Sequence, residues 1–498
     1  MTDFAASPNA HLDRLDPPIL WKHFRFLCDT PRPSGSETAV IDGIAQWAVA
    51  RGLETVKDAV GNLLVRKAAT PGHEQAPGIV LQGHVDMVAQ AAVPHDFQRD
   101  PIETEVRDGW LHAKGTTLGA DNGIGVAAAL AVLEDDTLVH GPLEALFTIG
   151  EEVSMEGALA LDPEWLNGRY LLNMDAEEWG SVYVGCAGGV HVLLDESLPV
   201  LPRKEALRTV QLAVSGLKGG HSGIDIGLQR GNAHVLLARA LLAVRESVDE
   251  LRLVAIEGGT MSNAIPRDAI ATIAVPADQV ERVAKTLDGL QQVVRAEWAH
   301  SDPDATLSLN EAAQPESNAL SAEASATLID LLNALPYGVA RWSDELEGVV
   351  ETSNNIGKLR LAEGQLTLDA MTRSLCDSAA LALVARIKAV CRLAGFSPAT
   401  SNVYPGWTPA LKSVLLEQFQ QQHDTVLGRP ADVRVIHAGL ECGLIGAKYP
   451  DMDMVAFGPT IRGAHSPDER VDLATVAAFW QLVRGLVERI GRTTPAAR

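Results

Sequence analysis

The sequence is poor in cysteine, in aromatic residues and in long apolar runs. Five cysteines among 498 residues, none in a CxxC pair, are too few for a disulfide framework, so we expect a reducing compartment, the cytoplasm. The longest apolar run, 124–133, is far shorter than the roughly 20 residues of a membrane span. Residues 1–18 carry charges and no apolar core, so we expect no signal peptide.

Basic residues are also scarce, because 41 Lys and Arg stand against 64 Asp and Glu, for a net charge of -23. This excess of negative charge repels phosphate backbones and anionic lipid, so we expect neither nucleic acid nor a membrane as a partner. Hydrophobic residues make up 46% of the chain and charged residues 21%, which is ordinary globular composition and excludes extended disorder.

Short apolar runs at 79–81, 143–149 and 170–174 are each bounded by glycine, proline or acidic residues. Between the first two lies 122–133, an alanine-rich segment long enough for a buried helix. Strands that alternate with helices in this way indicate an α/β layer with a mostly parallel sheet.

The pattern loosens at 188–202 and returns after Phe396. We therefore predict one α/β catalytic domain formed by 1–190 and 397–498, interrupted by an inserted α+β domain at 191–396. The segments 257–267 and 351–360 are faintly alike, so an insert made of two duplicated lobes is a further hypothesis.

Each of the three apolar runs leads into residues of metal-binding type. His84 and Asp86 follow the first, Glu151 and Glu152 the second, and Asp175 the third. The carboxyl ends of parallel strands meet at one edge of a sheet, so these side chains should converge. His84 can be a ligand oriented by Asp86, or the two can form a surface pair. Of the paired glutamates, one can bind a metal while the other acts as general base, or both can lie in a solvated loop.

Three further residues stand in glycine-rich or turn-like segments. Asp121 lies in GADNGIG, as a helix N-cap or as part of a site. His465 opens HSPDE, as a turn residue or a ligand, and His221 in GGHSG can donate to an oxyanion. The order His, Asp, Glu-Glu, Asp, His supplies enough ligands for two metals that share one carboxylate. Oxygen and imidazole ligands without thiolate suit zinc, cobalt or manganese.

Eight separated strings between residues 81 and 469 resemble the metallopeptidase family of aminoacylases, carnosinases and bacterial dipeptidases, and the resemblance covers the chain from about 17 to 489. They are LQGHVDMV, TLGADNGIG, FTIGEEVSMEGA, LLNMDAEE, GLKGGHSG, GGTMSNAIPR, HAGLECG and the PDMDM to HSPDE segment. The resemblance implies a di-zinc peptidase domain interrupted by a lid domain.

The resemblance also implies roles for single residues. One zinc would be held by His84, Asp121 and Asp175, and the other by Asp121, Glu152 and His465, with cobalt or manganese able to substitute. Glu151 would be the general base, Asp86 would orient His84, and a cis peptide bond would follow Asp121. In the lid, His221 would stabilise the oxyanion, Asn263 and Arg373 would contact the substrate's terminal carboxylate, and the 437–443 loop, with Gly439, would line the site through its backbone.

The expected function is metal-dependent hydrolysis of dipeptides, Xaa-His first among them, with β-Ala-His and broader Xaa-Xaa substrates open. An N-acyl amino acid deacylase or a carboxypeptidase would use the same metal core. A peptide-binding protein without catalysis is the hypothesis from another class. A homodimer is the expected assembly.

Overall fold

The computed structural model describes residues 7–312 and 318–493, which fall into two compact units. Unit 1 comprises Met1–Gly185, Pro409–Val435 and Leu440–Arg498, and unit 2 comprises Cys186–Thr408 and Ile436–Gly439. The predicted boundaries at 190/191 and 396/397 therefore lie 5 and 12 residues from the observed ones. The return of four residues, 436–439, to unit 2 was not predicted.

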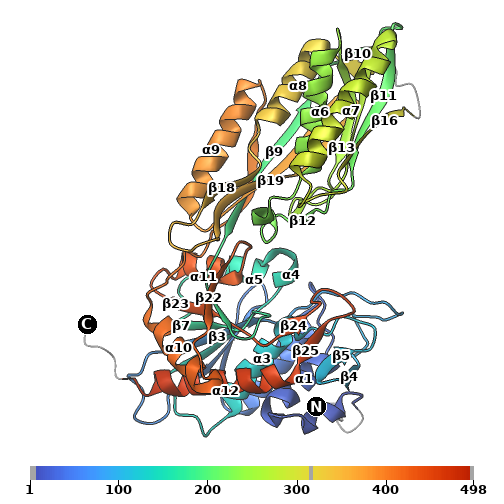
Figure 1. Cartoon of the computed structure of the whole chain (residues 1–498). Coiled ribbons are helices and arrows are strands. Elements are labelled where there is room, and N and C mark those ends of the chain that lie inside the picture. Colours follow the sequence, from blue (N-terminus) through green and yellow to red (C-terminus); the bar gives the residue numbers. More distant parts are fainter. Residues whose placement is uncertain (1–6, 313–317, 494–498) are drawn as a thin grey trace. The chain divides into compact units, whose positions relative to one another are not determined.

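Unit 1 is built on an eight-stranded sheet whose four central strands run parallel (Figure 1). The central strands are fully or almost fully buried, which fits their near-continuous apolar sequence. In spatial order the strands are β1 (Glu54–Lys57), β2 (Leu63–Lys67), β6 (Leu143–Thr148), β3 (Ile79–His84), β7 (Tyr170–Asn173), β23 (Asp453–Ala456), β8 (Ser181–Cys186) and β22 (Asp432–Ile436).

The helices of unit 1 enclose this sheet. Helix α3 (Ala120–Glu134) is buried along almost its whole length, packing on β3 and β6 and against α1 and α12, which explains its alanine-rich sequence without a polar face. The others are α1 (Pro18–Asp29), α2 (Thr38–Ala50), α4 (Glu151–Ser154), α5 (Glu156–Ala160), α10 (Val414–Leu427), α11 (Glu441–Lys448) and α12 (Leu473–Gly491). A small sheet adds β4 (Thr104–Arg107), β5 (Trp110–Ala113), β24 (Ile461–Arg462) and β25 (Arg470–Asp472).

Unit 2 contains one large, mainly antiparallel sheet with four helices packed along it (Figure 1). In spatial order its strands are β16 (Thr306–Glu311), β11 (Leu207–Ser215), β15 (Ala269–Pro276), β13 (Arg252–Gly258), β19 (Val350–Ala362), β20 (Gln365–Ser374), β9 (Gly188–Ser197) and β21 (Ala399–Tyr404), with β18 (Gly338–Trp342) beside β19. The helices are α6 (Ala233–Ser247), α7 (Val280–Glu297), α8 (Ala322–Ala334) and α9 (Asp377–Leu393). Strands β13 and β19 pair directly, so the two blocks suggested as duplicated lobes are halves of one sheet.

Short pairs of strands complete unit 2. They are β10 (Val200–Pro202) with β17 (Asn318–Leu320), and β12 (Gly220–His221) with β14 (Ala264–Ile265). The second pair brings the predicted oxyanion donor beside the segment that contains Asn263. Among the described residues, no helix combines the length and apolar character that crossing a bilayer requires.

Candidate metal centre

The predicted metal ligands converge at the carboxyl ends of the parallel strands of unit 1. His84 is the last residue of β3, and its Nε2 lies 3.3 Å from Asp121 Oδ1 and 3.3 Å from Asp175 Oδ1. His465 Nε2 lies 3.2 Å from Asp121 Oδ2 and 2.9 Å from Glu152 Oε2. The two oxygens of Asp121 therefore face two different histidines, and Asp121 belongs to both ligand groups.

Local backbone conformation places Asp121 at this point. Its φ of -80° and ψ of 112° are non-helical, so it stands out from the start of α3, and its peptide bond to Asn122 is cis. Asn122 then donates from Nδ2 to the carbonyl of Met174, 2.6 Å away, which ties the start of α3 to the end of β7. The interpretation of Asp121 as a simple N-cap does not hold, because α3 has no side-chain N-cap bond.

Asp86 connects His84 to the two glutamates. Its Oδ1 lies 3.3 Å from His84 Nδ1, and its carboxylate accepts hydrogen bonds from the backbone N–H groups of Glu151 (3.1 Å) and Glu152 (3.2 Å). Ser34 Oγ donates to Oδ2 at 2.8 Å. Burial alone would raise the pKa of Asp86, but the interactions with His84 and these donors bring it to about 2. The carboxylate of Asp86 therefore lies against Nδ1 of His84, while Nε2 of the same ring faces Asp121 and Asp175.

Negative charge is in excess at this centre. Burial, together with the neighbouring carboxylates, raises the pKa values of Glu151 and Asp175 well above their ordinary values, although His84 opposes this. Burial would lower the pKa of His84, but its acidic neighbours raise it well above the ordinary value. Hydrogen bonds to Asp121 and Glu152 raise the pKa of His465 to about 11. Raised pKa values of neighbouring carboxylates and imidazoles are expected at a cation site, because without the cation protons compensate the negative charge.

The residues present fit divalent cations. Their donors are carboxylate oxygen and imidazole nitrogen, the combination that binds zinc, cobalt and manganese. Glu152 Oε1 is buried and has no hydrogen-bond partner among the residues that the structure describes, so it keeps a lone pair for a further ligand. Glu151 Oε2 lies 4.0 Å from His84 Nε2, and Glu151 forms a third possible ligand group with His84 and Glu152. It belongs to neither of the two groups that contain Asp121.

The remaining predicted site residues, His221, Asn263, Arg373 and Gly439, all belong to unit 2. Arg373 is buried and donates from Nε to Ser222 Oγ (3.3 Å) and from Nη1 to Tyr404 Oη (2.9 Å). The backbone N–H of Ser222 donates to the carbonyl of Asn263.

The segment that carries Gly439 packs on the same turn as His221. A Cβ on Gly223 would lie only 1.9 Å from the carbonyl oxygen of His437, so this position admits only glycine. His437 is buried, and its Nε2 lies 2.8 Å from Ser353 Oγ. His437, the first residue of the predicted 437–443 loop, and Tyr404, which the sequence had not singled out, therefore also belong to this group in unit 2.

His221 has a defined tautomer. Its Nδ1 accepts hydrogen bonds from the backbone N–H groups of Gly223 (3.2 Å) and Ile224 (3.0 Å). A neutral ring that accepts at Nδ1 carries its proton on Nε2. Burial and the positive charge of Arg373 lower the pKa of His221 to about 4, so the ring is neutral at pH 7 and carries its proton on Nε2.

Two buried charged residues around Asp121 had been given no role from the sequence. Glu469 lies within the HSPDE string, and Arg32 lies in the PRPSG segment before α2. Both bond to main-chain atoms of the loop 118–121. Hydrogen bonds to backbone leave no partner side chain in the sequence, so no residue pattern pointed to either residue.

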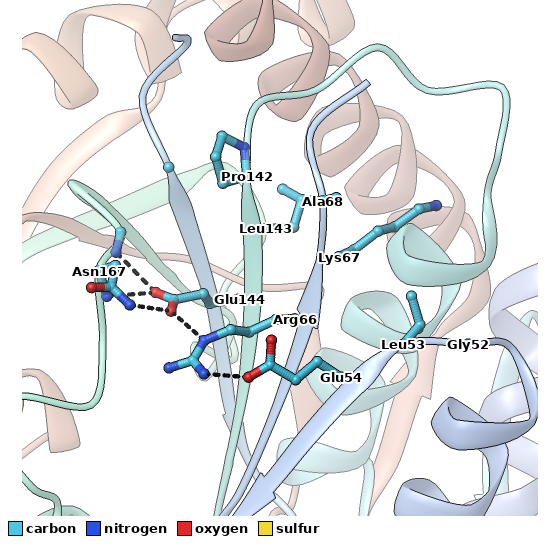
Figure 2. A pocket seen from close by; sticks show the side chains of 12 residues that line it. Gly52, Leu53, Glu54, Arg66, Lys67, Ala68, Pro142, Leu143, Glu144 and Asn167 are labelled. Carbon is cyan, nitrogen blue, oxygen red and sulfur yellow. Dashed lines mark hydrogen bonds and ion pairs between the residues drawn. The ribbon is translucent and has the colours of Figure 1, made fainter. Parts of the chain in front are cut away.

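A pocket in unit 1 lies at the opposite end of the sheet from the metal centre, at the amino ends of β3 and β6 (Figure 2). It encloses about 470 Å³ and is lined by two charged side chains of β2 and β6, Arg66 and Glu144, among others. These pair with each other (3.1 Å), while Arg66 also binds Glu54 (2.8 Å) and Glu144 accepts from the N–H groups of Asn167 and Gly168. Their charges are already matched, so this pocket has no comparable claim to be the functional site.

Comparison with known proteins agrees with this geometry. The model of Peptidase family M20/M25/M40 matches residues 80–489. The chain therefore belongs to this family of metal-dependent peptidases. Membership of this family confirms two predictions, the enzyme class and the α/β catalytic domain with an inserted lid domain.

Two relatives match almost the whole chain. The cytosol non-specific dipeptidase of Escherichia coli (strain K12) is 42% identical over 483 residues, which cover 97% of this chain and 99% of that protein. The crystal structure of an aminoacylhistidine dipeptidase from Vibrio alginolyticus superimposes with a TM-score of 0.89 at 42% identity, covering 98% of this chain and 99% of that one. Aminopeptidase PepT from Bacillus cereus shares the fold, with a TM-score of 0.56 at 17% identity and with 96% and 100% of the two chains covered.

Proposed function

We propose that this protein is a dinuclear zinc dipeptidase that hydrolyses the peptide bond of dipeptides, Xaa-His among them. The single observation that carries the proposal is Asp121, whose two oxygens face His84 and His465 and so can serve two cations at once. The two relatives of 42% identity, one called a dipeptidase and the other an aminoacylhistidine dipeptidase, support the substrate class.

Each cation has its own set of ligands in this proposal. His84, Asp121 and Asp175 hold one, and Asp121, Glu152 and His465 hold the other. Zinc is the proposed native metal, with cobalt or manganese as substitutes. When bound, the pair polarises the scissile carbonyl and acidifies the attacking water.

Glu151 is the proposed general base. The two ligand groups that share Asp121 are complete without Glu151, although it also forms a group with His84 and Glu152. In this proposal the carboxylate of Glu151 is therefore left to take a proton from the attacking water. The same oxygen then gives that proton to the departing amine. Asp86 has a positioning role, because it holds both the ring of His84 and the main chain at Glu151.

His221 is the proposed oxyanion donor, because its Nε2 carries a proton and its ring is neutral. Arg373 supplies a buried positive charge for the substrate's terminal carboxylate. Asn263 and the main chain at Gly439 are proposed to complete the contacts of that end of the substrate. Recognition of a free carboxylate close to the scissile bond would restrict the enzyme to short peptides.

His221→Ala should lower kcat by about 100- to 1,000-fold, which is the usual cost of removing one oxyanion donor. Because His221 lies in unit 2, the zinc content of the variant should remain that of the unsubstituted protein. Steady-state kinetics and elemental analysis of the same sample measure both. His300→Ala, which removes an exposed histidine of unit 2, is the matched control. An unchanged kcat for His221→Ala would exclude the donor role.

The experiment that tests the proposed function is hydrolysis of a dipeptide panel by zinc-loaded protein. The panel contains Xaa-His dipeptides, β-Ala-His, dipeptides without histidine and N-acetylated amino acids. We expect cleavage of the free dipeptides, and the relative kcat/KM values define the preference. Cleavage of the N-acetylated members alone would identify a deacylase instead, and binding without cleavage would identify a peptide-binding protein.

We also propose a cytoplasmic location, which the word cytosol in the name of the Escherichia coli relative and the scarcity of cysteine support. The homodimer stays a prediction, as does the absence of nucleic acid among the partners.

A further inference from the structure

Glu469 places a buried carboxylate against four consecutive backbone N–H groups. Its Oε2 accepts from Leu118 (2.7 Å) and Gly119 (2.9 Å), and its Oε1 accepts from Ala120 (2.8 Å) and Asp121 (3.2 Å). The residue is 2% exposed. These four bonds fix the main chain of the loop 118–121, including the N–H of Asp121, whose side chain faces both histidines.

Arg32 holds the same loop through its carbonyl side. Nη2 donates to the carbonyl of Gly119 at 2.6 Å, while Nη1 donates to the carbonyls of Val85 (2.9 Å) and Asp86 (3.1 Å). Gly119 has a φ of 68°, and a Cβ there would lie 2.5 Å from Arg32 Nη2. The loop therefore needs glycine both for its conformation and for the approach of the guanidinium group.

The two side chains link segments that carry different ligands. Glu469 lies four residues after His465, so it ties the main chain of the His465 segment to that of Asp121. Arg32 ties the main chain just after His84 to that of Gly119, two residues before Asp121. Each link therefore spans one histidine and the carboxylate that this histidine faces.

Packing alone does not account for such a pair. Each buried charged side chain loses its hydration, a cost that an apolar side chain of similar volume would not have. Here every one of the seven bonds goes to main chain in the loop 118–121 or directly after His84. Charge-assisted hydrogen bonds to main chain are strong and directional, which suits a role in setting position.

We propose that Glu469 and Arg32 are positioning residues that set the affinity of the two metal positions by fixing Asp121 relative to His465 and to His84. This inference rests on the metal centre of the proposed function. Glu469 governs chiefly the group formed by Asp121, Glu152 and His465. Arg32 governs chiefly the group formed by His84, Asp121 and Asp175.

Glu469→Gln tests the first half of the proposal. The amide keeps the volume of the side chain but turns an N–H₂ group toward two backbone N–H donors, so at least two of the four bonds are lost. We expect one of the two zinc dissociation constants of the metal-free protein to rise by about 10- to 100-fold, as for other residues that orient metal ligands. Titration against a chromophoric chelator measures both constants. Asp468→Asn removes an exposed carboxylate one residue away and should leave both unchanged.

Arg32→Lys tests the second half, because lysine keeps the charge but lacks the fork that reaches three carbonyls. We expect it to raise the other zinc dissociation constant. Comparison with Asp175→Ala and His465→Ala identifies which constant belongs to which ligand group. Circular dichroism shows whether each variant is folded, and if Glu469→Gln does not fold, Arg32→Lys and Glu469→Asp decide the question. Both constants within twofold of the unsubstituted protein in the folded variants would overturn the inference alone. Absence of zinc binding by the unsubstituted protein would overturn the metal centre itself.

Discussion

Replacement of Glu151 by glutamine should lower kcat by about 100- to 10,000-fold, the range that a positioned general base contributes. The amide has the size of the carboxylate but cannot accept the proton of the attacking water. Because Glu151 stands outside both ligand groups that share Asp121, the variant should still bind two cations. Its KM should change little, since the lost interaction is one made in the transition state.

The control for this variant is Glu156→Gln, which removes an exposed carboxylate at the start of α5, five residues along the chain. It should keep the kcat of the unsubstituted protein. Elemental analysis of Glu151→Gln separates the two possible roles of this carboxylate. Loss of zinc together with activity would assign Glu151 to the metal and leave the base to be found elsewhere.

How far the sequence could predict this site depends on what each residue contacts. His84, Glu151, Glu152 and Asp175 follow apolar strands, and parallel pairing of β3, β6 and β7 does bring them together. Apolar runs and the residues that follow them are visible in the sequence, so the convergence of these four residues could be predicted from physical reasoning alone. Asp121 was ambiguous, because a carboxylate before a helix is an ordinary cap.

His465 lies 344 residues from Asp121, and no local pattern connects them. Its place in the site came from the resemblance of separated strings. The resemblance could not reveal Glu469 or Arg32, whose partners are peptide groups and therefore leave no complementary residue in the sequence. The division of roles between Glu151 and Glu152 was likewise inherited, since adjacent carboxylates on a short helix are equivalent in a sequence.

The fold shows the same limit. Alternation of strands and helices predicted the parallel centre of the unit 1 sheet, because buried parallel strands are apolar throughout. The edges of the insert were misplaced by 5 and 12 residues. At the first edge, β8 ends at Cys186 and β9 begins at Gly188 without a linker of distinctive composition. Residues 436–439 continue directly from β22, and only their contacts assign them to unit 2.

The negative charge at the centre explains why its assembly should depend on metal. Five carboxylates, those of Asp86, Asp121, Glu151, Glu152 and Asp175, face two histidines in a largely buried setting. Without cations, protons must compensate this charge. The pKa values of Glu151 and Asp175 are therefore raised, which favours their protonated forms. Cation binding should therefore release protons and stabilise unit 1.

Asp121→Ala should weaken both zinc positions, because it removes the one carboxylate that faces His84 with one oxygen and His465 with the other. We expect activity to fall by at least about 10,000-fold, since the pKa of the attacking water is no longer lowered by the metal. Asp175→Ala and His465→Ala are the matched variants, each of which removes a ligand from one group only. Zinc titration should show that both dissociation constants rise for Asp121→Ala and that only one rises for each of the other two variants. If Asp121→Ala kept one constant unchanged, the two positions would not share this residue, and the bridging role of Asp121 would have to be abandoned.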